Sequence, residues 1–168
     1  AALDLALVRS RRDRERLRRQ LTPDQHASAV EDLTGFHWPD DGLERLGNDT
    51  AGFRVLGGGV DGRMVTTPQH DPGLTWLLVI KRLAQAGASS AVQRDLVSGE
   101  GALLSGLSLT DQPGDAVFTE ALDALHWRLY AVRADADWRA GIEALWLDVE
   151  AEDGAEAAWR TVLTVMMR

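Results

Sequence analysis

The side chains that could do acid–base or metal chemistry gather in two short stretches around histidines. His37 is followed by Asp40 and Asp41, and His70 is followed directly by Asp71. Imidazole and carboxylate groups that converge can form an acid–base pair or the ligand set of a divalent metal. No HxH or HExxH spacing supports such a site, and the aspartates also suit helix caps. A hydrolase-type enzyme with this His/Asp site is our third hypothesis. The sequence leaves open whether the five side chains converge, and we expect no metal, no cofactor and no catalytic residue.

Arginines near the N-terminal end are the other group of residues with unusual chemistry. Residues 1–19 hold seven arginines and three acidic residues, so this segment carries a charge of +4. Because the net charge of the whole chain is −8, the remaining residues carry −12. The guanidinium groups could bind nucleic-acid phosphates, or the acidic surface of a partner protein or second copy. They could equally lie on a solvated helix with local ion pairs. The acidic remainder would oppose a phosphate backbone, so we favour protein contact. The candidate contact residues are Arg9, Arg11, Arg12, Arg16 and Arg19.

Two further patterns have plainer explanations. The run 57–59 consists of three glycines, but it lacks the GK[ST] and GxGxxG patterns of phosphate-binding loops, so we interpret it as a hairpin loop. Tryptophan precedes arginine at Trp127, Trp138 and Trp159, as in base-stacking platforms. Because tryptophan buries a large area and recurs here at helical spacing, we expect these rings in the core instead.

The predicted helix over residues 71–86 is the element around which we expect the other elements to pack. Asp71 can cap it, Pro72 suits its first position, and Gly87 can end it. Its apolar residues cover nearly every side, which predicts a buried helix with Trp76 and Leu78 in the core. The alternative is a buried strand over residues 75–80.

Helix signals precede this stretch, and a hairpin signal lies between them. Residues 3–21 predict a basic first helix, and Thr22 with Gln25 predicts a capping box for a second helix that ends at Gly35. The dipeptide Asp61-Gly62 predicts the turn of a β-hairpin whose strands are residues 52–56 and 63–67.

The C-terminal third permits two interpretations. Apolar residues recur at helical spacing after Asp115, and again from Trp138 to Val149, which favours helices. Residues also alternate at 127–131 and 145–149, and residues 161–167 tolerate a strand, so an antiparallel meander is the alternative.

Composition sets the remaining limits. The chain has 168 residues and no cysteine, which fits one domain and excludes disulfides and thiolate metal sites. The longest stretch without a charged residue, residues 83–93, is too short for a membrane span. We therefore expect no membrane partner and a cytoplasmic location.

Together these patterns predict an α+β fold. It is a mostly helical single domain with one central β-hairpin, and the meander is the alternative at its C-terminal end. Residues 1–21 form the basic helix and residues 22–168 the acidic globular domain. The leading function is a non-enzymatic, self-associating interaction or adaptor module that uses the basic helix as one contact. The second hypothesis is a nucleic-acid-associated regulator that binds phosphates through Arg9–Arg19.

Overall fold

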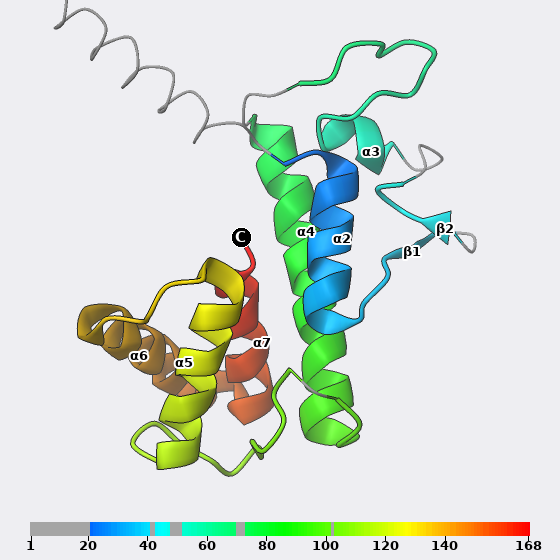
Figure 1. Cartoon of the computed structure of the whole chain (residues 1–168). Coiled ribbons are helices and arrows are strands. Elements are labelled where there is room, and N and C mark those ends of the chain that lie inside the picture. The colour runs from blue at the N-terminus through cyan, green and yellow to red at the C-terminus, as the bar shows by residue number, and fades with distance from the viewer. Residues whose placement is uncertain (1–20, 41–42, 48–51, 70–72, 102) are drawn as a thin grey trace, which may run out of the picture.

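The computed structural model describes residues 21–40, 43–47, 52–69, 73–101 and 103–168. This part of the chain is helical, and its helices pack around the long helix α4 and the C-terminal helix α7 (Figure 1). The helices are α2 (Pro23–Thr34), α3 (Phe53–Leu56), α4 (Leu74–Val92), the π-helix η1 (Gln93–Val97), α5 (Ala116–Tyr130), α6 (Ala136–Asp153) and α7 (Ala155–Met166).

The predicted α+β class is wrong, because the central hairpin is absent. Residues 53–56 form helix α3, and residues 63–67 form a loop. Asp61 explains the loop, since its Oδ1 accepts hydrogen bonds from the amides of the three residues at 63–65 at 2.8, 2.9 and 2.8 Å. A carboxylate that takes these amides removes the donors that a strand would pair. The same bonds, led by that from Arg63, hold the pKa of Asp61 below its ordinary value.

Strand pairing in the described residues is confined to a short antiparallel ladder. Strand β1 (Pro39–Asp40) pairs with β2 (Leu43–Glu44), in the register Pro39 to Glu44 and Asp40 to Leu43. Strands of two residues each are too short to form a layer of the fold.

The alternative of a C-terminal meander is also wrong, and the favoured prediction of helices is confirmed. Helices α5, α6 and α7 occupy this third of the chain. Asp135 caps α6 by accepting a hydrogen bond from the Trp138 amide (2.7 Å), and Ile142 and Trp146 form the buried stripe of that helix. The 3.6-residue repeat therefore decides the structure here, and the local alternation does not.

Helix α2 begins and ends as predicted. The Gln25 amide donates to Thr22 Oγ1 (3.3 Å), and the Thr22 amide donates to Gln25 Oε1 (2.9 Å), which completes a capping box. Gly35 ends the helix in the left-handed region at φ 68°.

Helix α4 differs from its prediction at the C-terminal end. Asp71 and Pro72 lie outside the described residues, and Gly73 is the N-cap. Gly87 does not end the helix, which continues to Val92. It is buried against α2, where a Cβ atom would lie 2.8 Å from Cγ1 of Val30. Gly87 thus permits close packing of two helices.

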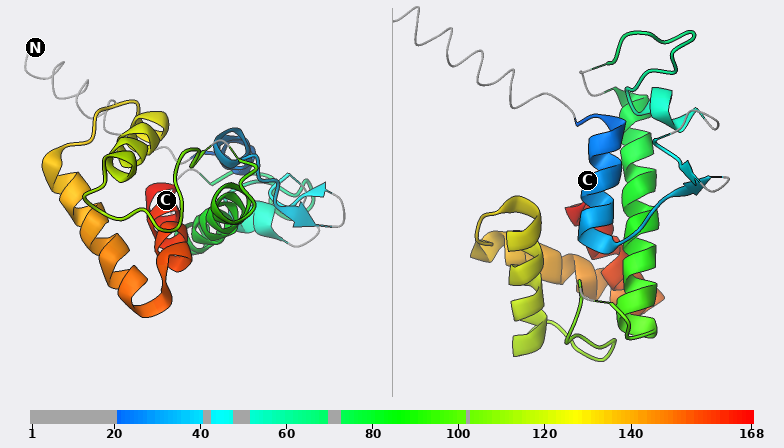
Figure 2. Two further views of the ribbon diagram at one scale, coloured as in Figure 1. Left: turned by 90° about the horizontal axis from the view of Figure 1, so that it is seen from below. Right: turned by 45° about the vertical axis from the view of Figure 1, so that its right-hand side comes forward.

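The buried residues form two clusters that share α4. Figures 1 and 2 show the arrangement of the helices that contribute to them. The C-terminal cluster joins α5, α6, α7 and the end of α4. In it, the ring of Phe118 packs against Trp146 and Trp159 at centroid distances of 5.3 and 4.9 Å. The N-terminal cluster lies between α2, α4 and the chain around residues 38–46. Its buried members are Val30, Trp38, Leu46, Val79 and Leu83.

The prediction that α4 is buried on nearly every side is wrong for its N-terminal half. Val79 and Ile80 are buried, whereas Leu74, Leu77 and Leu78 are 74%, 47% and 55% exposed. None of the helices in the described part of the chain is long and apolar enough to cross a bilayer.

An ion pair between partly exposed Arg94 and buried Asp95 joins the two clusters at the π-helix. Asp95 Oδ2 accepts hydrogen bonds from the amides of Leu103 and Leu104, both at 2.8 Å, and its Oδ1 accepts from Arg94 Nε at 2.9 Å. Arg94 also donates to the Thr34 carbonyl at the end of α2. The pair thereby fixes η1, the loop that follows it and the C-terminus of α2 to one another.

Candidate functional site

Most of the residues that the sequence singles out lie outside the described part of the chain. These are the arginines at 9, 11, 12, 16 and 19, and also Asp41, His70 and Asp71. His37 is exposed and pairs with Glu31 (Nε2 to Oε1, 3.1 Å). Among the described residues, no three histidines, aspartates or glutamates lie close enough to hold a metal ion. The convergence of the His/Asp residues stays untested.

The two histidines that the sequence did not single out support packing. His26 lies against the Trp76 ring (centroids 5.6 Å apart), and burial lowers its pKa to about 4. His126 Nδ1 lies 2.9 Å from the Val132 carbonyl oxygen, and its ring packs against Trp138 (centroids 4.3 Å apart). Both rings are therefore part of the helix contacts.

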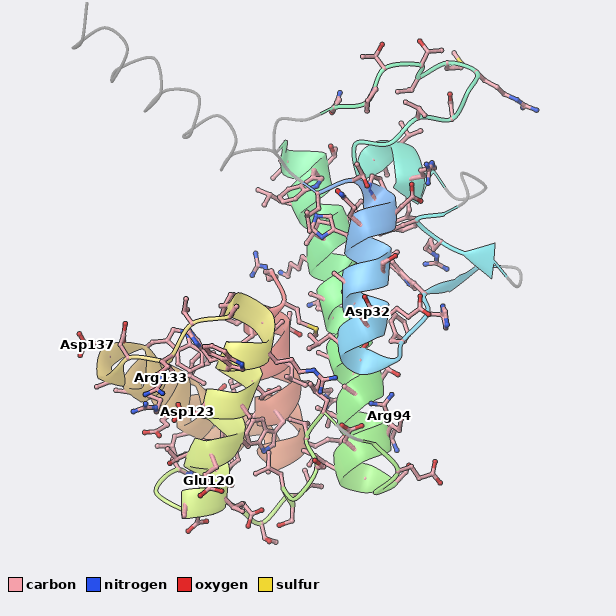
Figure 3. All side chains as sticks on the ribbon, viewed as in Figure 1. Asp32, Arg94, Glu120, Asp123, Arg133 and Asp137 are labelled. Carbon is pink, nitrogen blue, oxygen red and sulfur yellow. The ribbon has the colours of Figure 1, made fainter. Side chains whose placement is uncertain are left out.

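The expectation that the tryptophans beside arginines are core residues is correct for Trp159 and wrong for Trp127. Trp159 is fully buried, whereas Trp127 is 58% exposed in a hollow of about 350 Å³ with Asp123, Arg133 and Arg139. Figure 3 labels Asp123 and Arg133 of this hollow. Arg139 already pairs with Asp123 (2.7 Å). The hollow thus holds one carboxylate and two guanidinium groups beside the exposed ring.

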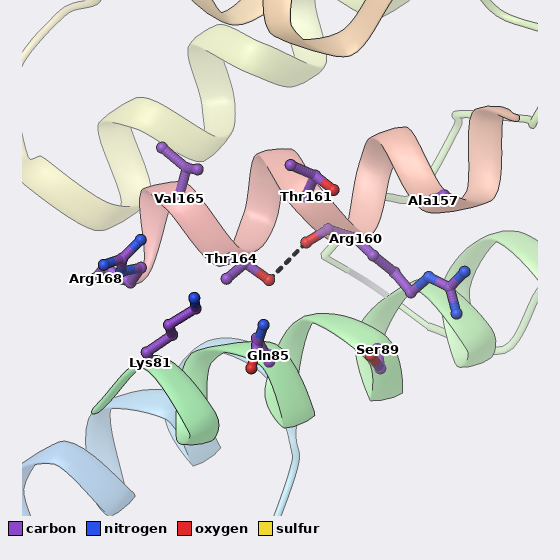
Figure 4. Close-up of a pocket in the computed structure, with 9 residues that line it drawn as sticks. All are labelled: Lys81, Gln85, Ser89, Ala157, Arg160, Thr161, Thr164, Val165 and Arg168. Carbon is purple, nitrogen blue, oxygen red and sulfur yellow. Dashed lines mark hydrogen bonds between the residues drawn. The ribbon is translucent and has the colours of Figure 1, made fainter. Parts of the chain in front are cut away.

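One face of α4 carries two different surfaces in succession. Residues three or four apart on a helix share a face, and the solvent-side stripe of α4 consists of Leu74, Leu77, Leu78, Lys81, Gln85 and Ser89. Helix α7 runs beside the polar part of the stripe and ends level with Lys81 (Figure 4). The leucines are exposed because they lie beyond the end of α7.

The leucines form an apolar surface together with α3. Leu56 is 45% exposed, and it lines a hollow of about 260 Å³ with Leu78 and the aromatic side chain of Phe53. Arg82 lies at the edge of this hollow. We call the set Leu56, Leu74, Leu77 and Leu78 the leucine surface.

The polar part of the stripe faces α7 across a groove of about 520 Å³ (Figure 4). Lys81, Gln85 and Ser89 approach it from α4. The side chains from α7 and the residues after it are Ala157, Arg160, Thr161, Thr164, Val165 and Arg168. The lining holds three cationic side chains and no acidic side chain. We call this cavity the α4–α7 groove.

Charge is unevenly distributed among the helices. Helix α4 contains no acidic residue, and α7 contains only Glu156. Helix α6, on the other side of α7 from α4, carries six acidic residues and one arginine (Figure 2). The groove is thus a positive region of a chain whose net charge is −8.

No family model, curated protein or solved structure matched the chain. The two surfaces of α4 are therefore the features from which function can be inferred.

Sequence reasoning missed both surfaces, although a signal for them is present. Along one face, α4 changes from leucine at residues 74–78 to polar residues at 81, 85 and 89. A count of apolar residues around the whole helix conceals this change along its axis.

Proposed function

We propose that the protein is a non-enzymatic interaction module that self-associates through the leucine surface. The observation that carries the proposal is the exposure of Leu74, Leu77 and Leu78 on one face of α4. Contiguous apolar side chains on a protein surface mark interaction sites more often than scattered ones do.

A second copy suits this surface better than the basic N-terminal segment of the same chain. Lys81 and Arg82 lie directly after the leucines, and residues 1–19 carry a charge of +4. Like charges brought together oppose docking. The leucine surface of a second copy brings apolar area without that net charge.

The same cations favour an antiparallel pairing of the two α4 helices. A parallel pairing would place Lys81 and Arg82 beside the same residues of the second copy. An antiparallel pairing about Leu77 and Leu78 places them beside the uncharged start of the other helix. Such a two-fold contact uses one surface twice, as most homodimers do. The four leucines that each copy contributes bury less surface area than a standard protein–protein interface does. We therefore expect a dissociation constant in the micromolar range.

The arginine-rich segment is the second proposed contact. Its positive charge suits the acidic remainder of another copy, and Arg9, Arg11, Arg12, Arg16 and Arg19 stay the predicted residues. Exposed ion pairs are screened by salt, whereas apolar contacts are not. The two contacts can therefore be separated by ionic strength.

Sedimentation equilibrium of the full chain over a range of concentrations tests the proposal. We expect a monomer–dimer equilibrium that Leu74→Glu with Leu78→Glu weakens at least tenfold at both low and high salt. Leu147→Glu is the matched control, because Leu147 is 46% exposed on α6, away from the leucine surface. Changing Arg11, Arg12, Arg16 and Arg19 to Gln should weaken association at low salt only. A wild-type chain that stays monomeric at all concentrations would refute the proposal.

A further inference from the structure

We infer that the α4–α7 groove binds an elongated small anion with several phosphate groups. This site shares no residue with the leucine surface, which it adjoins at Lys81, and it goes beyond the proposed self-association. The inference depends on the shape of the groove, on its charge and on the donors that face it.

The groove has the size and length for such a ligand. Its volume of about 520 Å³ lies within the range typical of small-molecule sites, roughly 300–1,000 Å³. Lys81 and Ser89 are two turns apart on α4, which corresponds to about 12 Å along the helix. Lys81 and Arg168 lie at one end, and Arg160 lies at the other (Figure 4).

The positive charge of the groove is largely uncompensated. Lys81 and Arg168 form no ion pair with any described residue, and Arg160 pairs only with Glu156, at a long 3.5 Å on the surface. Since α4 has no acidic residue, no carboxylate of its own competes for an incoming anion. A cleft lined by charge of one sign concentrates ligands of the opposite sign.

The uncharged side chains of the groove supply donors between the two charged ends. Gln85 and Ser89 line it from α4, and Thr161 lines it from α7. Thr164 Oγ1 instead donates to the Arg160 carbonyl (2.7 Å), which turns its hydroxyl proton away from a ligand. Guanidinium, ammonium, amide and hydroxyl donors together suit phosphate oxygens.

A small anion fits this site better than nucleic acid does. The cations lie within one groove between two helices, whereas the acidic surface of α6 would oppose a long phosphate backbone. Cations at both ends predict that affinity depends on ligand length, because one phosphate reaches only one end.

Isothermal titration calorimetry with the full chain at low salt tests the inference. The probes are tripolyphosphate, orthophosphate and a single-stranded DNA 12-mer. We expect tripolyphosphate to bind at least tenfold more tightly than orthophosphate. Lys81→Gln with Arg160→Gln should weaken tripolyphosphate binding at least tenfold. The matched control is Arg63→Gln with Arg128→Gln, which removes the same charge at two exposed positions outside the groove and should change affinity less than twofold.

A single substitution provides a second measurement that does not depend on removing cations. Gln85→Glu places a carboxylate in the middle of the groove on an exposed helix position, and it should abolish tripolyphosphate binding without changing the circular dichroism of the chain. Four results would overturn the inference: no saturable binding of tripolyphosphate, equal losses in both double variants, equal affinity for orthophosphate, or tighter binding of the DNA.

Discussion

Asp95 shows how one side chain can determine the path of a loop. Its carboxylate is fully buried, and three donors satisfy it, of which two are backbone amides of the loop. The loop approaches so closely that a Cβ atom on Gly101 would lie 1.4 Å from Asp95 Oδ1. The absence of a side chain at residue 101 is therefore a condition for this contact.

We predict that Asp95→Ala lowers the free energy of unfolding by about 3–5 kcal/mol. The substitution removes the acceptor of the Leu103 and Leu104 amides and the ion-pair partner of Arg94, which keeps only the Thr34 carbonyl. Backbone donors that lose their acceptor inside a protein are costly. Urea unfolding followed by circular dichroism measures the loss. Asp61→Ala is the control, because Asp61 also accepts three backbone amides but is only partly buried, and it should cause a much smaller loss. Similar losses of unfolding free energy for Asp95→Ala and Asp61→Ala would contradict the prediction that burial of the carboxylate determines its contribution to stability.

At the residue scale, the sequence predicts contacts that are local. The capping box of Thr22 and Gln25 and the end of α2 at Gly35 were predictable, because each joins residues within a few positions. Asp95 was not, since its amide partners are eight and nine residues away and share no pattern with it. Gly87 was misinterpreted because its neighbour Val30 comes from a different helix.

At the element scale, apolar content predicts that a helix packs somewhere but not along which part of its length. Leu78 is as apolar as Leu83, yet Leu83 is buried in the cluster with α2 whereas Leu78 is 55% exposed. The prediction of a β-hairpin was wrong because the sequence does not show which groups the backbone amides bind. The Asp61-Gly62 dipeptide does turn the chain, but hydrogen bonds to the Asp61 side chain replace strand pairing.

Two helix glycines should respond in opposite directions to the same substitution. Gly87→Ala gains helix propensity but forces a methyl group against Val30, so we expect a net loss of about 1 kcal/mol. Gly141→Ala on α6 has open space around the new methyl group, so we expect a gain of about 0.5–1 kcal/mol. Chemical denaturation of both variants gives the comparison.

The same contact predicts a rescue. Val30→Ala should remove most of the additional loss caused by Gly87→Ala, because the two residues touch and their effects are not additive. If Gly87→Ala stabilised the chain as much as Gly141→Ala, that result would contradict the close packing of α4 against α2 at Gly87 and Val30.

At the scale of the whole molecule, the two buried clusters differ in size. The C-terminal cluster contains fully buried Phe118, Trp146 and Trp159, whereas the buried members of the N-terminal cluster are one tryptophan and four aliphatic residues. Local opening requires less free energy where fewer apolar contacts are broken. Stability should therefore fall from the C-terminal helices toward α2.

Amide hydrogen exchange of the full chain should detect this difference. After correction for intrinsic rates, we expect the interior amides of α2 to exchange at least tenfold faster than those of α7, which corresponds to about 1.4 kcal/mol. The amides of α4 that lie after Gly87 should resemble α7, because they belong to the larger cluster. Uniform exchange across α2 and α7 would indicate a single cooperative unit instead.

The sequence predicted some features of the whole molecule and not others. The helical repeats of α5 and α6 were visible because their cores follow a regular spacing. The arrangement of α7 between α4 and α6 was not, since it depends on contacts between residues far apart in the chain. The groove between α4 and α7 is a product of that arrangement and was equally hidden.

The placement of acidic α6 on one side of α7 and acid-free α4 on the other gives this part of the molecule an electric dipole moment. A dipole turns in the field of a charged object before any contact forms. An approaching anion therefore meets the α4–α7 side more often than it would if the orientation of the molecule were random. This bias acts when the anion is within a Debye length of the surface, which is about 10 Å in 0.1 M salt. Added salt shortens that range, so the bias in orientation weakens while the shape of the molecule stays the same.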